Sequence, residues 1–543
     1  MNNSNKPELY IVFYSHLDTQ WRWDYPHTIK EYIKNTLKDN FALLDKYDNY
    51  IFNFSGANRY RFMKEYYPED YDKLKKYIAS GKWFPCGSSF EESDVLTPNI
   101  ESIIRQILYG NKYFKDEFGI ESLEYMLPDC FGFPNTLPSI LAHCGIIGFS
   151  TQKLSWGSAN GIPFNIGKWV GPDDNSVIVS FNPGDYITQV KENLSENVKW
   201  LERITKQGNE TGIYKEYMYV GTGDWGGAPD EDSIKNINES IQKEGKIKLI
   251  PSKADKFFND IITSDTSKLP IYKGELLLTN HSAGSLTSQA YVKRWNRKNE
   301  FLAYSAEVSS VMNYCITGKE YPQSRINRAW ELFLSAQFHD ILPGTSIPKA
   351  YEYSWNDQIT AMNIFANIIK NNIRDISYHL DTNVEGTPIA IYNPLPYERE
   401  EIIEVIFKNQ DKELQFISVY DSEQNEIPSQ IKKLSSDTFL VIFYAKVPSM
   451  GFTVYEIKKS KHNHPFSSNL NVKEYKLENE YLLIELNKNG DINRIFDKYN
   501  NKEILKNPIR YIFLHEKPKE FPAWNMDWKD REKEPYDYVH SEP

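Results

Sequence analysis

The sequence lacks several features that would direct it to a membrane or to nucleic acid. It has no apolar run long enough to cross a bilayer, and its polar start, residues 1–7, lacks the pattern of a secretory signal peptide. Its formal net charge of −11 makes nucleic acid and anionic membrane surfaces poor partners. The four cysteines include no C-x-x-C pair, so they give no thiolate metal site and suit a reducing cytosol. We therefore expect a cytoplasmic protein that binds neither a membrane nor nucleic acid.

The length of 543 residues, with 40% hydrophobic and 25% charged residues, is typical of a globular protein of several domains. Short strands alternate with helices in the first part of the chain, which predicts a parallel α/β domain over residues 1–265. Helical patterns follow and predict a helical bundle over residues 266–383. The patterns after that are short and alternating, so residues 384–543 are predicted to be all-β.

The all-β region carries a turn signal and an end that looks unfinished. Asn489-Gly490 lies between two alternating apolar runs and predicts a β-hairpin. Aromatic residues that such a fold still has to bury lie close to the end of the sequence; they are Trp524, Trp528, Tyr536 and Tyr538. We therefore expect this region to be truncated.

An apolar and aromatic run, residues 9–14, predicts a buried strand that leads into His16 and Asp18. Residues i and i+2 of an extended strand point to the same side, so both side chains can reach one metal ion. A strand that simply exits to solvent is an equally good interpretation of this stretch alone.

Three more acidic or imidazole side chains lie at the ends of buried runs. Asp129 directly follows a predicted strand, Asp224 lies in a glycine-rich loop after another, and His339 ends an apolar helical run. If the strands are parallel, Asp18, Asp129 and Asp224 lie at the same C-terminal edge of the sheet, where α/β proteins place their sites.

Two histidines and two carboxylates make a nitrogen-and-oxygen set of about four ligands, which suits zinc or a similar ion better than magnesium. Each residue also has a purely structural interpretation. Asp129 can be a turn residue after a proline, Asp224 a loop residue among glycines, and His339 a buried helix histidine. The joint pattern is harder to explain by accident than any one member.

Five motifs occur along the chain in a fixed order. They are Ser15-His16-Leu17-Asp18 with Trp21, Leu127-Pro128-Asp129-Cys130-Phe131-Gly132, Thr151-Gln152-Lys153-Leu154-Ser155-Trp156, Gly223-Asp224-Trp225-Gly226-Gly227, and Phe338-His339-Asp340-Ile341-Leu342-Pro343-Gly344-Thr345. In sequence and in order they resemble glycoside hydrolase family 38, the retaining, metal-dependent α-mannosidases. Residues 274–281 and 287–290 also resemble the family, and the loop around Asp224 resembles its cytosolic and bacterial branch.

The resemblance implies an irregular seven-stranded β/α barrel, a three-helix bundle and the start of a β-sandwich region. It implies that His16, Asp18, Asp129 and His339 hold one Zn²⁺, or another divalent ion such as Co²⁺. Asp129 is then also the nucleophile, and Asp224 the general acid and base. The residues expected to bind the sugar are Trp21, Asp340, Trp225 and His281. Family members continue through large β domains, so we expect this chain to lack its C-terminal β domains.

The implied function is an exo-acting, retaining α-mannosidase that hydrolyses mannose-containing oligosaccharides or mannosides. Retention requires two carboxyl groups about 5–5.5 Å apart. Asp224 has to stay protonated near neutral pH, and Asp129 has to stay ionised beside a cation. The linkage, α-1,2, α-1,3 or α-1,6, stays open, and a homo-oligomer is compatible with the sequence.

Three other functions stay open at this point. One is a hydrolase of a mannosyl conjugate such as mannosylglycerate. A second is a metal-dependent carbohydrate deacetylase, which needs no covalent nucleophile and usually has more histidines. A third is an inactive glycan-binding relative, which loss of Asp129 or Asp224 would mark; both are present.

Overall fold

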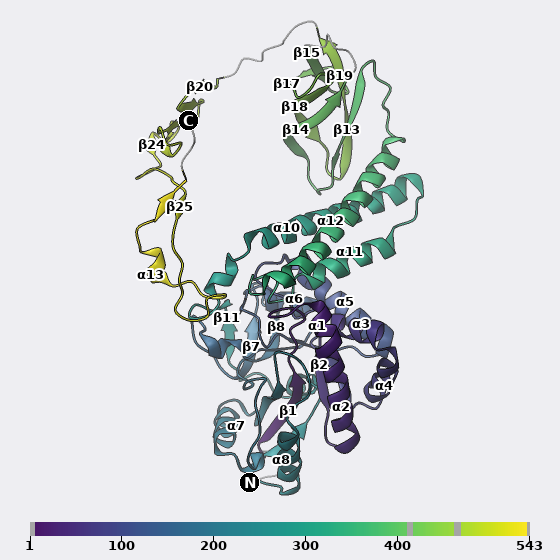
Figure 1. Cartoon of the computed structure of the whole chain (residues 1–543), viewed down its shortest axis with the longest axis vertical. Coiled ribbons are helices and arrows are strands. Elements are labelled where there is room, and N and C mark those ends of the chain that lie inside the picture. The colour runs from purple at the N-terminus through teal and green to yellow at the C-terminus, as the bar shows by residue number, and fades with distance from the viewer. Residues whose placement is uncertain (1–5, 410–415, 461–468, 540–543) are drawn as a thin grey trace. The chain divides into compact units, whose positions relative to one another are not determined.

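The computed structural model describes residues 6–409, 416–460 and 469–539, which divide into two compact units (Figure 1). The first unit comprises Met1–Ala303, Gln323–Phe365 and Pro518–Met526. The second unit comprises Tyr304–Pro322, Ala366–Lys517 and Asp527–Pro543.

The first unit is built around β1 (Glu8–Ser15), which is buried at every residue after Glu8. A parallel strand covered on both faces is apolar throughout, which is why the run of residues 9–14 predicted it. β9 (Lys215–Thr222) pairs with β1 in parallel over its whole length. On the other edge of β1, β10 (Lys248–Pro251) pairs with its first half and β2 (Phe52–Ser55) with its second half. β3 (Trp83–Cys86) pairs in parallel with β2 and continues the sheet.

A second sheet contains three short parallel strands, β4 (Glu124–Met126), β6 (Gly148–Ser150) and β8 (Ser176–Ser180). β7 (Ile166–Val170) departs from the predicted parallel order, because the five residues that join it to β8 are enough only for a hairpin. β11 (Ile271–Lys273) pairs with β7. A separate antiparallel pair consists of β5 (Gly132–Phe133) and β12 (Leu276–Leu277).

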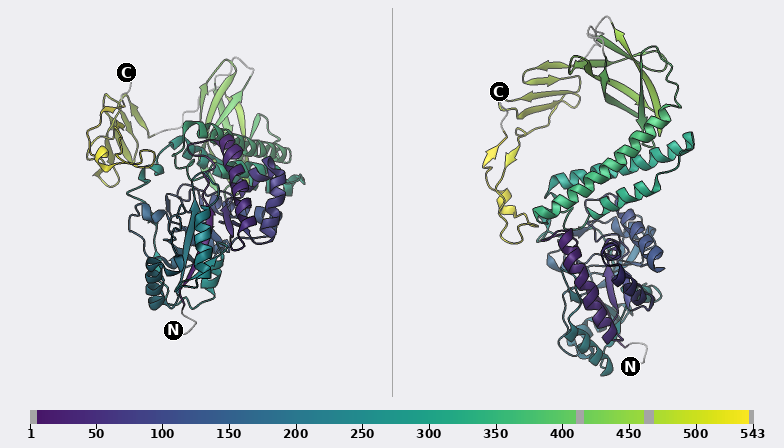
Figure 2. Two further views of the ribbon diagram at one scale, coloured as in Figure 1. Left: turned by 60° about the horizontal axis from the view of Figure 1, so that its bottom comes forward. Right: turned by 45° about the vertical axis from the view of Figure 1, so that its right-hand side comes forward.

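Helices cover the outer sides of these strands (Figures 1 and 2). In α5 (Ile100–Phe118), the side chain of Asn99 accepts a hydrogen bond from Ser102 N at 2.8 Å, and Gly119 ends the helix with φ 68°. The other helices of this part are α1 (Tyr25–His27), η2 (Thr28–Ile33), α2 (Lys34–Lys46), α3 (Ala57–Tyr66), α4 (Pro68–Ala79), α6 (Leu137–His143), η3 (Lys153–Trp156), η4 (Leu194–Glu196), α7 (Val198–Thr211), α8 (Glu231–Gln242), α9 (Lys256–Ile262) and η5 (Ala283–Leu286). α4 contacts β3, α7 contacts β9, and α8 contacts β10.

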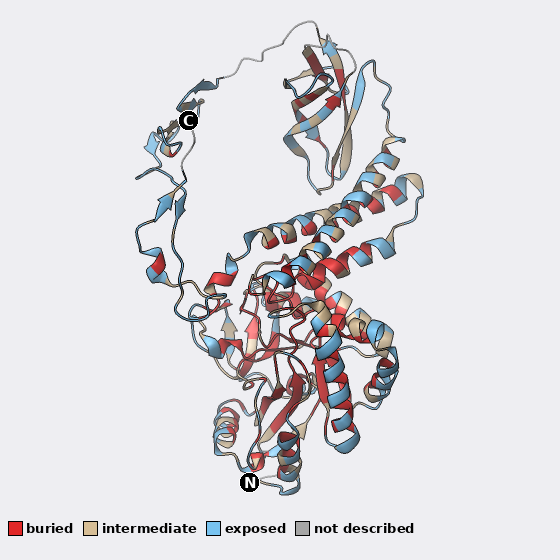
Figure 3. Cartoon of the chain, in the orientation of Figure 1, coloured by how far each residue is buried: buried red, intermediate tan, exposed pale blue. Residues whose placement is uncertain are grey.

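The buried side chains of the first unit concentrate on its strands and on the helix faces that cover them (Figure 3). One apolar cluster surrounds Phe149 and Trp169, and another surrounds Tyr217 and Phe257. These clusters fix the strands whose carboxyl ends carry the predicted site residues. Across the described residues, no helix has both the length and the apolar character of a membrane span.

Three long helices follow the sheets: α10 (Ala290–Thr317), α11 (Gln323–Ser335) and α12 (Pro348–Ser377). α11 belongs to the first unit, whereas α10 and α12 begin there and end in the second. Within the first unit, the Trp330 ring on α11 packs 6.1 Å from the Phe365 ring on α12.

The second unit is rich in antiparallel strands, whose apolar core includes Val419 and Val441. The predicted hairpin at Asn489-Gly490 is confirmed, since β22 and β23 pair in antiparallel order on either side of it. Its elements are β13 (Thr387–Asn393), β14 (Arg399–Lys408), β15 (Phe416–Tyr420), β16 (Glu426–Ile427), β17 (Ser429–Lys433), β18 (Thr438–Val447), β19 (Gly451–Ser460), β20 (Asn471–Lys473), β21 (Lys476–Glu478), β22 (Leu482–Leu486), β23 (Ile492–Asp497), β24 (Lys502–Glu503), β25 (Ile512–Phe513), α13 (Trp528–Arg531) and β26 (Asp537–Tyr538). The predicted combination of a parallel α/β part, helices and a β-rich C-terminal part is therefore confirmed.

Candidate active site

His16 and Asp18 directly follow β1, and backbone hydrogen bonds fix them against the end of β9. His16 N donates to Thr222 O at 2.9 Å, and Asp18 N donates to Asp224 O at 2.7 Å. His16 is fully buried and Asp18 is 2% exposed, so neither is a surface residue at the end of a strand. The parallel pairing of β1 and β9 therefore places both residues beside the loop that carries Asp224.

Three of the four predicted metal ligands converge on one point. Asp18 Oδ1 lies 3.0 Å from His16 Nε2 and 3.3 Å from His339 Nε2. All three atoms are buried, and none has a hydrogen-bond partner within the described parts of the chain. Buried polar atoms are normally paired, so an unpaired nitrogen-and-oxygen set of this kind fits a divalent cation. The ligand atoms of the three residues lie within 4.8 Å of one another.

Both histidines are held from behind by a residue that the sequence analysis did not identify, Glu92. Its Oε2 lies 3.2 Å from His16 Nδ1, and its backbone oxygen lies 2.9 Å from His339 Nδ1. Burial alone would raise the pKa of Glu92, but the His16 ring and the Arg59 guanidinium outweigh it and lower the pKa. Such partners orient metal-binding imidazoles and leave the other ring nitrogen free for the ion.

Asp129 follows β4 and faces the same point. Its Oδ2 lies 3.8 Å from His339 Nε2, and its Oδ1 accepts a hydrogen bond from Lys153 Nζ at 2.6 Å. Lys153 is 4% exposed, so its ammonium group is shielded from solvent and pairs with this carboxylate. Sequence reasoning did not assign a role to Lys153, although it lies within one of the quoted motifs.

Asp224 receives a hydrogen bond on Oδ1 from the Tyr186 hydroxyl at 2.6 Å. Burial raises the pKa of Asp224, and the negative charges of Asp18 and Asp129 raise it further, against the opposing effects of His16 and Tyr186. The site therefore contains one carboxyl group whose pKa is raised and another that accepts a hydrogen bond from a lysine. Tyr186 was not predicted.

Asp340 lies next to His339 and is 2% exposed. Its Oδ2 is 3.5 Å from His339 Nε2, and its Oδ1 accepts a hydrogen bond from the Thr345 hydroxyl. Burial and the charge of Asp18 raise the pKa of Asp340 to about 7. Asp340 can therefore donate as well as accept a hydrogen bond near neutral pH.

A cavity of about 180 Å³ opens over these groups. Its lining combines four carboxyl groups, two basic side chains and a wall of aromatic rings: Asp18, Trp21, Arg22, Asp129, Lys153, Trp156, Tyr186, Asp224, His281, Asp340, Phe521 and Trp524. The predicted sugar-binding residues Trp21, Asp340 and His281 are among them. Trp225 is not, since its side chain is 54% exposed and lines a different hollow with Ile187 and Asp230.

Part of the aromatic wall comes from Pro518–Met526, far along the chain. Gly284 N donates to Trp524 O at 2.8 Å, and Ser282 N donates to Asn525 Oδ1 at 2.9 Å. The rings of Phe521 and Trp524 lie 4.8 Å and 5.9 Å from the His281 ring. We had expected Trp524 to be an aromatic residue that an unfinished β fold leaves unburied, but it packs at the cavity.

This is an α/β protein whose site joins a candidate metal set to two carboxyl groups in different electrostatic settings. The model of the glycosyl hydrolases family 38 N-terminal domain matches residues 6–275, the α-mannosidase middle domain model matches residues 280–376, and the family 38 C-terminal domain model matches residues 477–542. The chain belongs to glycosyl hydrolase family 38. The last match lies where we expected the C-terminal β domains to be lacking, so part of that domain is present.

Named relatives agree with the family. Alpha-mannosidase G of Dictyostelium discoideum is 28% identical over 540 residues, which cover 93% of this chain and 48% of that protein. Alpha-mannosidase of Saccharomyces cerevisiae is 30% identical over 357 residues, which cover 64% of this chain and 32% of that protein. The crystal structure of an alpha-mannosidase from Enterococcus faecalis shares the fold, with a TM-score of 0.75 at 19% identity over 92% of this chain and 61% of that one. The chain spans about half the length, or less, of these curated relatives.

Proposed function

We propose that this chain is a retaining α-mannosidase that releases terminal α-linked mannose from oligosaccharides or mannosides. The observation that carries the proposal is the cavity in which Asp129 and Asp224 flank the buried set of His16, Asp18 and His339. Membership of family 38 and the names of the relatives support the same chemistry.

Asp224 is the proposed general acid. Burial and the charges of Asp18 and Asp129 raise its pKa, which is the direction a general acid requires, and the Tyr186 hydroxyl fixes the orientation of its carboxyl group. After the proton has left, the carboxylate accepts a proton from the incoming water in the second step.

Asp129 is the proposed nucleophile. Its carboxylate attacks the anomeric carbon while the bond to the leaving oxygen breaks, and a mannosyl ester forms. Water then cleaves this ester and regenerates the carboxylate, so the configuration is retained. The hydrogen bond from Lys153 to Oδ1 orients the carboxylate, whose Oδ2 lies 3.8 Å from His339 Nε2.

Zn²⁺, or Co²⁺ in its place, is the proposed ion, held by His16, Asp18, Asp129 and His339. The unpaired nitrogen and oxygen atoms of three of these residues fit a borderline divalent ion better than magnesium. When bound, the ion supplies Lewis acidity that gathers sugar hydroxyls at the cavity floor.

Trp21, Asp340 and His281 are the proposed contacts of the sugar, since all three line the cavity. Burial, followed by the charge of Lys153, lowers the pKa of His281 to about 4, so this ring is neutral and can accept a hydrogen bond from a hydroxyl. Trp225 has no such support. The irregular seven-stranded barrel, the boundaries at residues 265 and 383, the homo-oligomer and the cytoplasmic location stay predictions.

A panel of substrates tests this function. The zinc-loaded chain is expected to release mannose from 4-nitrophenyl α-mannoside and from at least one of the α-1,2-, α-1,3- and α-1,6-linked mannobioses, but not from the β-anomers. Release of acetate from acetylated sugars without release of mannose would indicate a deacetylase. Saturable binding of mannosides by the folded, zinc-loaded chain without any hydrolysis would indicate a glycan-binding relative.

A further inference from the structure

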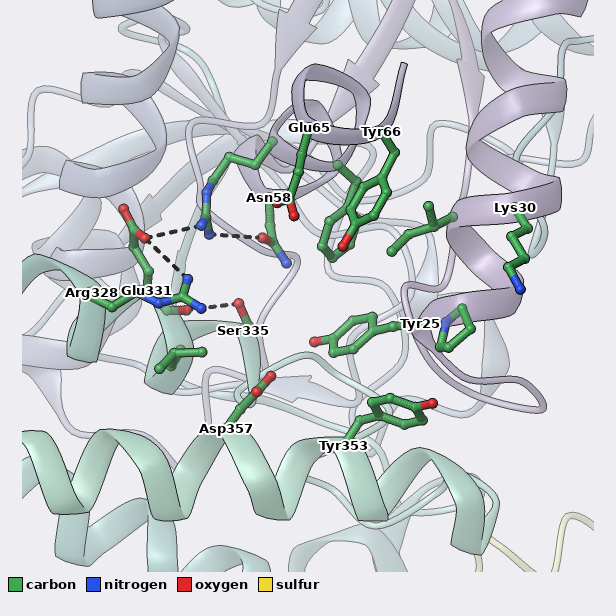
Figure 4. A pocket seen from close by; sticks show the side chains of 15 residues that line it. Tyr25, Lys30, Asn58, Glu65, Tyr66, Arg328, Glu331, Ser335, Tyr353 and Asp357 are labelled. Carbon is green, nitrogen blue, oxygen red and sulfur yellow. Dashed lines mark hydrogen bonds and ion pairs between the residues drawn. The ribbon is translucent and has the colours of Figure 1, made fainter. Parts of the chain in front are cut away.

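A second cavity, of about 540 Å³, lies in the first unit and shares no lining residue with the cavity described above (Figure 4). Its walls come from the start of α1 and η2, from α3, from α11 and from α12. The volume falls within the range of small-molecule sites, about 300–1,000 Å³. None of its residues has a role in the proposed hydrolysis.

Three of the four aromatic rings that line the cavity contact one another. The Tyr25 ring lies 5.5 Å from the Phe62 ring and 6.2 Å from the Tyr353 ring, with interplanar angles of 64° and 73°. The rings meet edge to face, which is a favoured arrangement and holds each ring against the next. Tyr25 and Tyr353 are each half-buried, so both present apolar surface to a ligand.

The arginines of the cavity are already engaged. Arg61 Nη2 lies 3.1 Å from Glu331 Oε2, and Arg328 Nη1 lies 3.9 Å from the same oxygen. Arg61 Nη1 also donates to Asn58 Oδ1 at 3.3 Å. Arg61 is held by two partners, whereas Arg328 is 55% exposed and pairs only at 3.9 Å. Each guanidinium retains N–H groups for a further acceptor.

Asp357 is the free acceptor of the cavity. Its carboxylate accepts a hydrogen bond from Asn356 Nδ2 at 3.4 Å, and it forms no ion pair within 4.0 Å among residues 6–409, 416–460 and 469–539. Burial raises the pKa of Asp357 to about 6, against the opposing charges of Arg328 and Arg61. The group is therefore ionised at neutral pH and accepts hydrogen bonds from a ligand.

The charges of the cavity balance. Its cations are Lys30, Arg61 and Arg328, and its carboxylates are Glu65, Glu331 and Asp357. An anion would meet three carboxylates, and a cation would meet three basic groups. A neutral ligand with several hydroxyl groups and apolar ring faces suits both the balanced charge and the aromatic walls.

We propose that this cavity binds a neutral saccharide, with its C–H faces against Tyr25 and Tyr353 and its hydroxyl groups on Asp357 and Arg61. The site is separate from the proposed catalytic cavity and holds sugar without cleaving it. This goes beyond the proposed hydrolysis, because the residues that would bind the sugar here are distinct from those that would cut it.

Isothermal titration of the full chain with neutral sugars tests the proposal. The probes are an S-linked mannobioside, which glycosidases do not cleave, maltose and N,N′-diacetylchitobiose. At least one is expected to saturate the wild type. Asp357→Asn, which keeps the shape of the side chain, is expected to weaken this binding about tenfold, since a charge-assisted acceptor is lost. Tyr353→Ala is expected to weaken it at least as much.

The matched control is Glu352→Gln, an exposed neighbour of Tyr353 whose carboxylate pairs with Lys349 outside the cavity. It is expected to bind as the wild type does. Hydrolysis of 4-nitrophenyl α-mannoside is expected to stay unchanged in Asp357→Asn, so failure of the sugar site and failure of the proposed function remain distinguishable.

Two results would overturn the inference. One is binding of every probe by folded Asp357→Asn and Tyr353→Ala with wild-type affinity, or no binding of any probe to the wild type. The other is tighter binding of inorganic phosphate or spermidine than of any sugar, with the same dependence on Asp357 and Tyr353, which would show that the ligand is charged.

Discussion

The two ends of β9 carry buried charge in opposite states. At the amino end, both oxygens of the fully buried Glu216 accept hydrogen bonds of 2.8 Å from Arg203. At the carboxyl end, Asp224 lies beside His16 and Asp18, whose Nε2 and Oδ1 atoms have no hydrogen-bond partner in the described structure. The same strand therefore ends in a satisfied ion pair on one side and in an unsatisfied cluster on the other.

This difference distinguishes a buried charge that stabilises the fold, at Glu216, from buried polar groups that serve the proposed chemistry, at His16 and Asp18. An unpaired polar atom in the interior costs about 1–3 kcal/mol, so a cluster of such atoms persists only where the surrounding fold holds it in place. Glu92 and Arg59 supply that support at the carboxyl end. We therefore expect changes at the carboxyl end to affect chemistry, and changes at the amino end to affect stability.

Removal of the metal is expected to have the largest effect. Excess chelator followed by dialysis should abolish turnover, because the converging ligand atoms are left without a partner, and zinc or cobalt should restore it. Bound metal, measured by mass spectrometry of the element, should fall from about one ion per chain to near zero. Full activity in a metal-free chain would contradict the assignment.

His339→Ala sharpens the same comparison, because it removes one ligand atom without touching the others. Zinc affinity is expected to fall at least 100-fold, measured by competition with a chelating dye. His379→Ala removes an exposed histidine at the end of α12 and is expected to leave zinc affinity unchanged. Equal affinity in both variants would remove His339 from the ligand set.

Asp224→Ala is expected to reduce turnover of mannobiose by about 10²–10⁴-fold, the usual contribution of a general acid. Nitrophenyl mannosides should lose far less in the first step, since their leaving group departs without a proton. The measurement is the ratio of kcat/KM for the two substrate types. An equal loss on both would show that Asp224 is not the acid.

Arg203→Ala tests the amino end of β9. It leaves Glu216 buried without its cation and is expected to lower the free energy of unfolding by about 3 kcal/mol, as for other broken buried pairs. The activity of the folded fraction should stay the same. Denaturant unfolding checks this against Lys199→Ala, which changes an exposed lysine of the same helix. If Arg203→Ala lost activity without losing stability, the amino end of β9 would serve the chemistry rather than the fold.

The smallest effect expected is a shift in the pH profile of Tyr186→Phe. The Tyr186 hydroxyl donates to Asp224 and favours its carboxylate, so its loss should raise the pKa of Asp224 further. The general acid has to be protonated, and the alkaline limb of kcat on mannobiose should therefore move to higher pH by up to about one unit. Tyr219→Phe, whose hydroxyl bonds Ser150 away from the cavity, should leave the limb in place. A shift to lower pH would contradict the role of the hydrogen bond.

Local sequence rules could predict much of this site. The spacing of His16 and Asp18 follows from the two-residue period of a strand, and the place of Asp224 beside them follows from the parallel pairing of β1 and β9. Asp129 follows β4 of the second sheet, so its approach to His339 does not follow from one shared sheet edge. The buried run that predicted β1 also gave the central strand of the first sheet. These features depend on a few neighbouring residues, which is why the sequence alone could reveal them.

The residues that support the site could not be found in this way. Glu92, Lys153 and Tyr186 act through contacts with residues 24 to 247 positions away, and no local pattern reports such contacts. The wall from Pro518–Met526 depends on a long return of the chain. Trp225, which the family resemblance placed at the sugar, stays a prediction: its side chain is 54% exposed and lines a different hollow, because a loop pattern does not determine which way a side chain points.

The central claim is that Asp129 forms a covalent bond to the sugar during turnover. The most direct test is peptide mass mapping of the zinc-loaded chain after inactivation with 5-fluoro-mannosyl fluoride, which slows cleavage of the ester. One added fluoromannosyl group is expected on the peptide that contains Asp129. A label on Asp224, or on any other carboxylate, would contradict it.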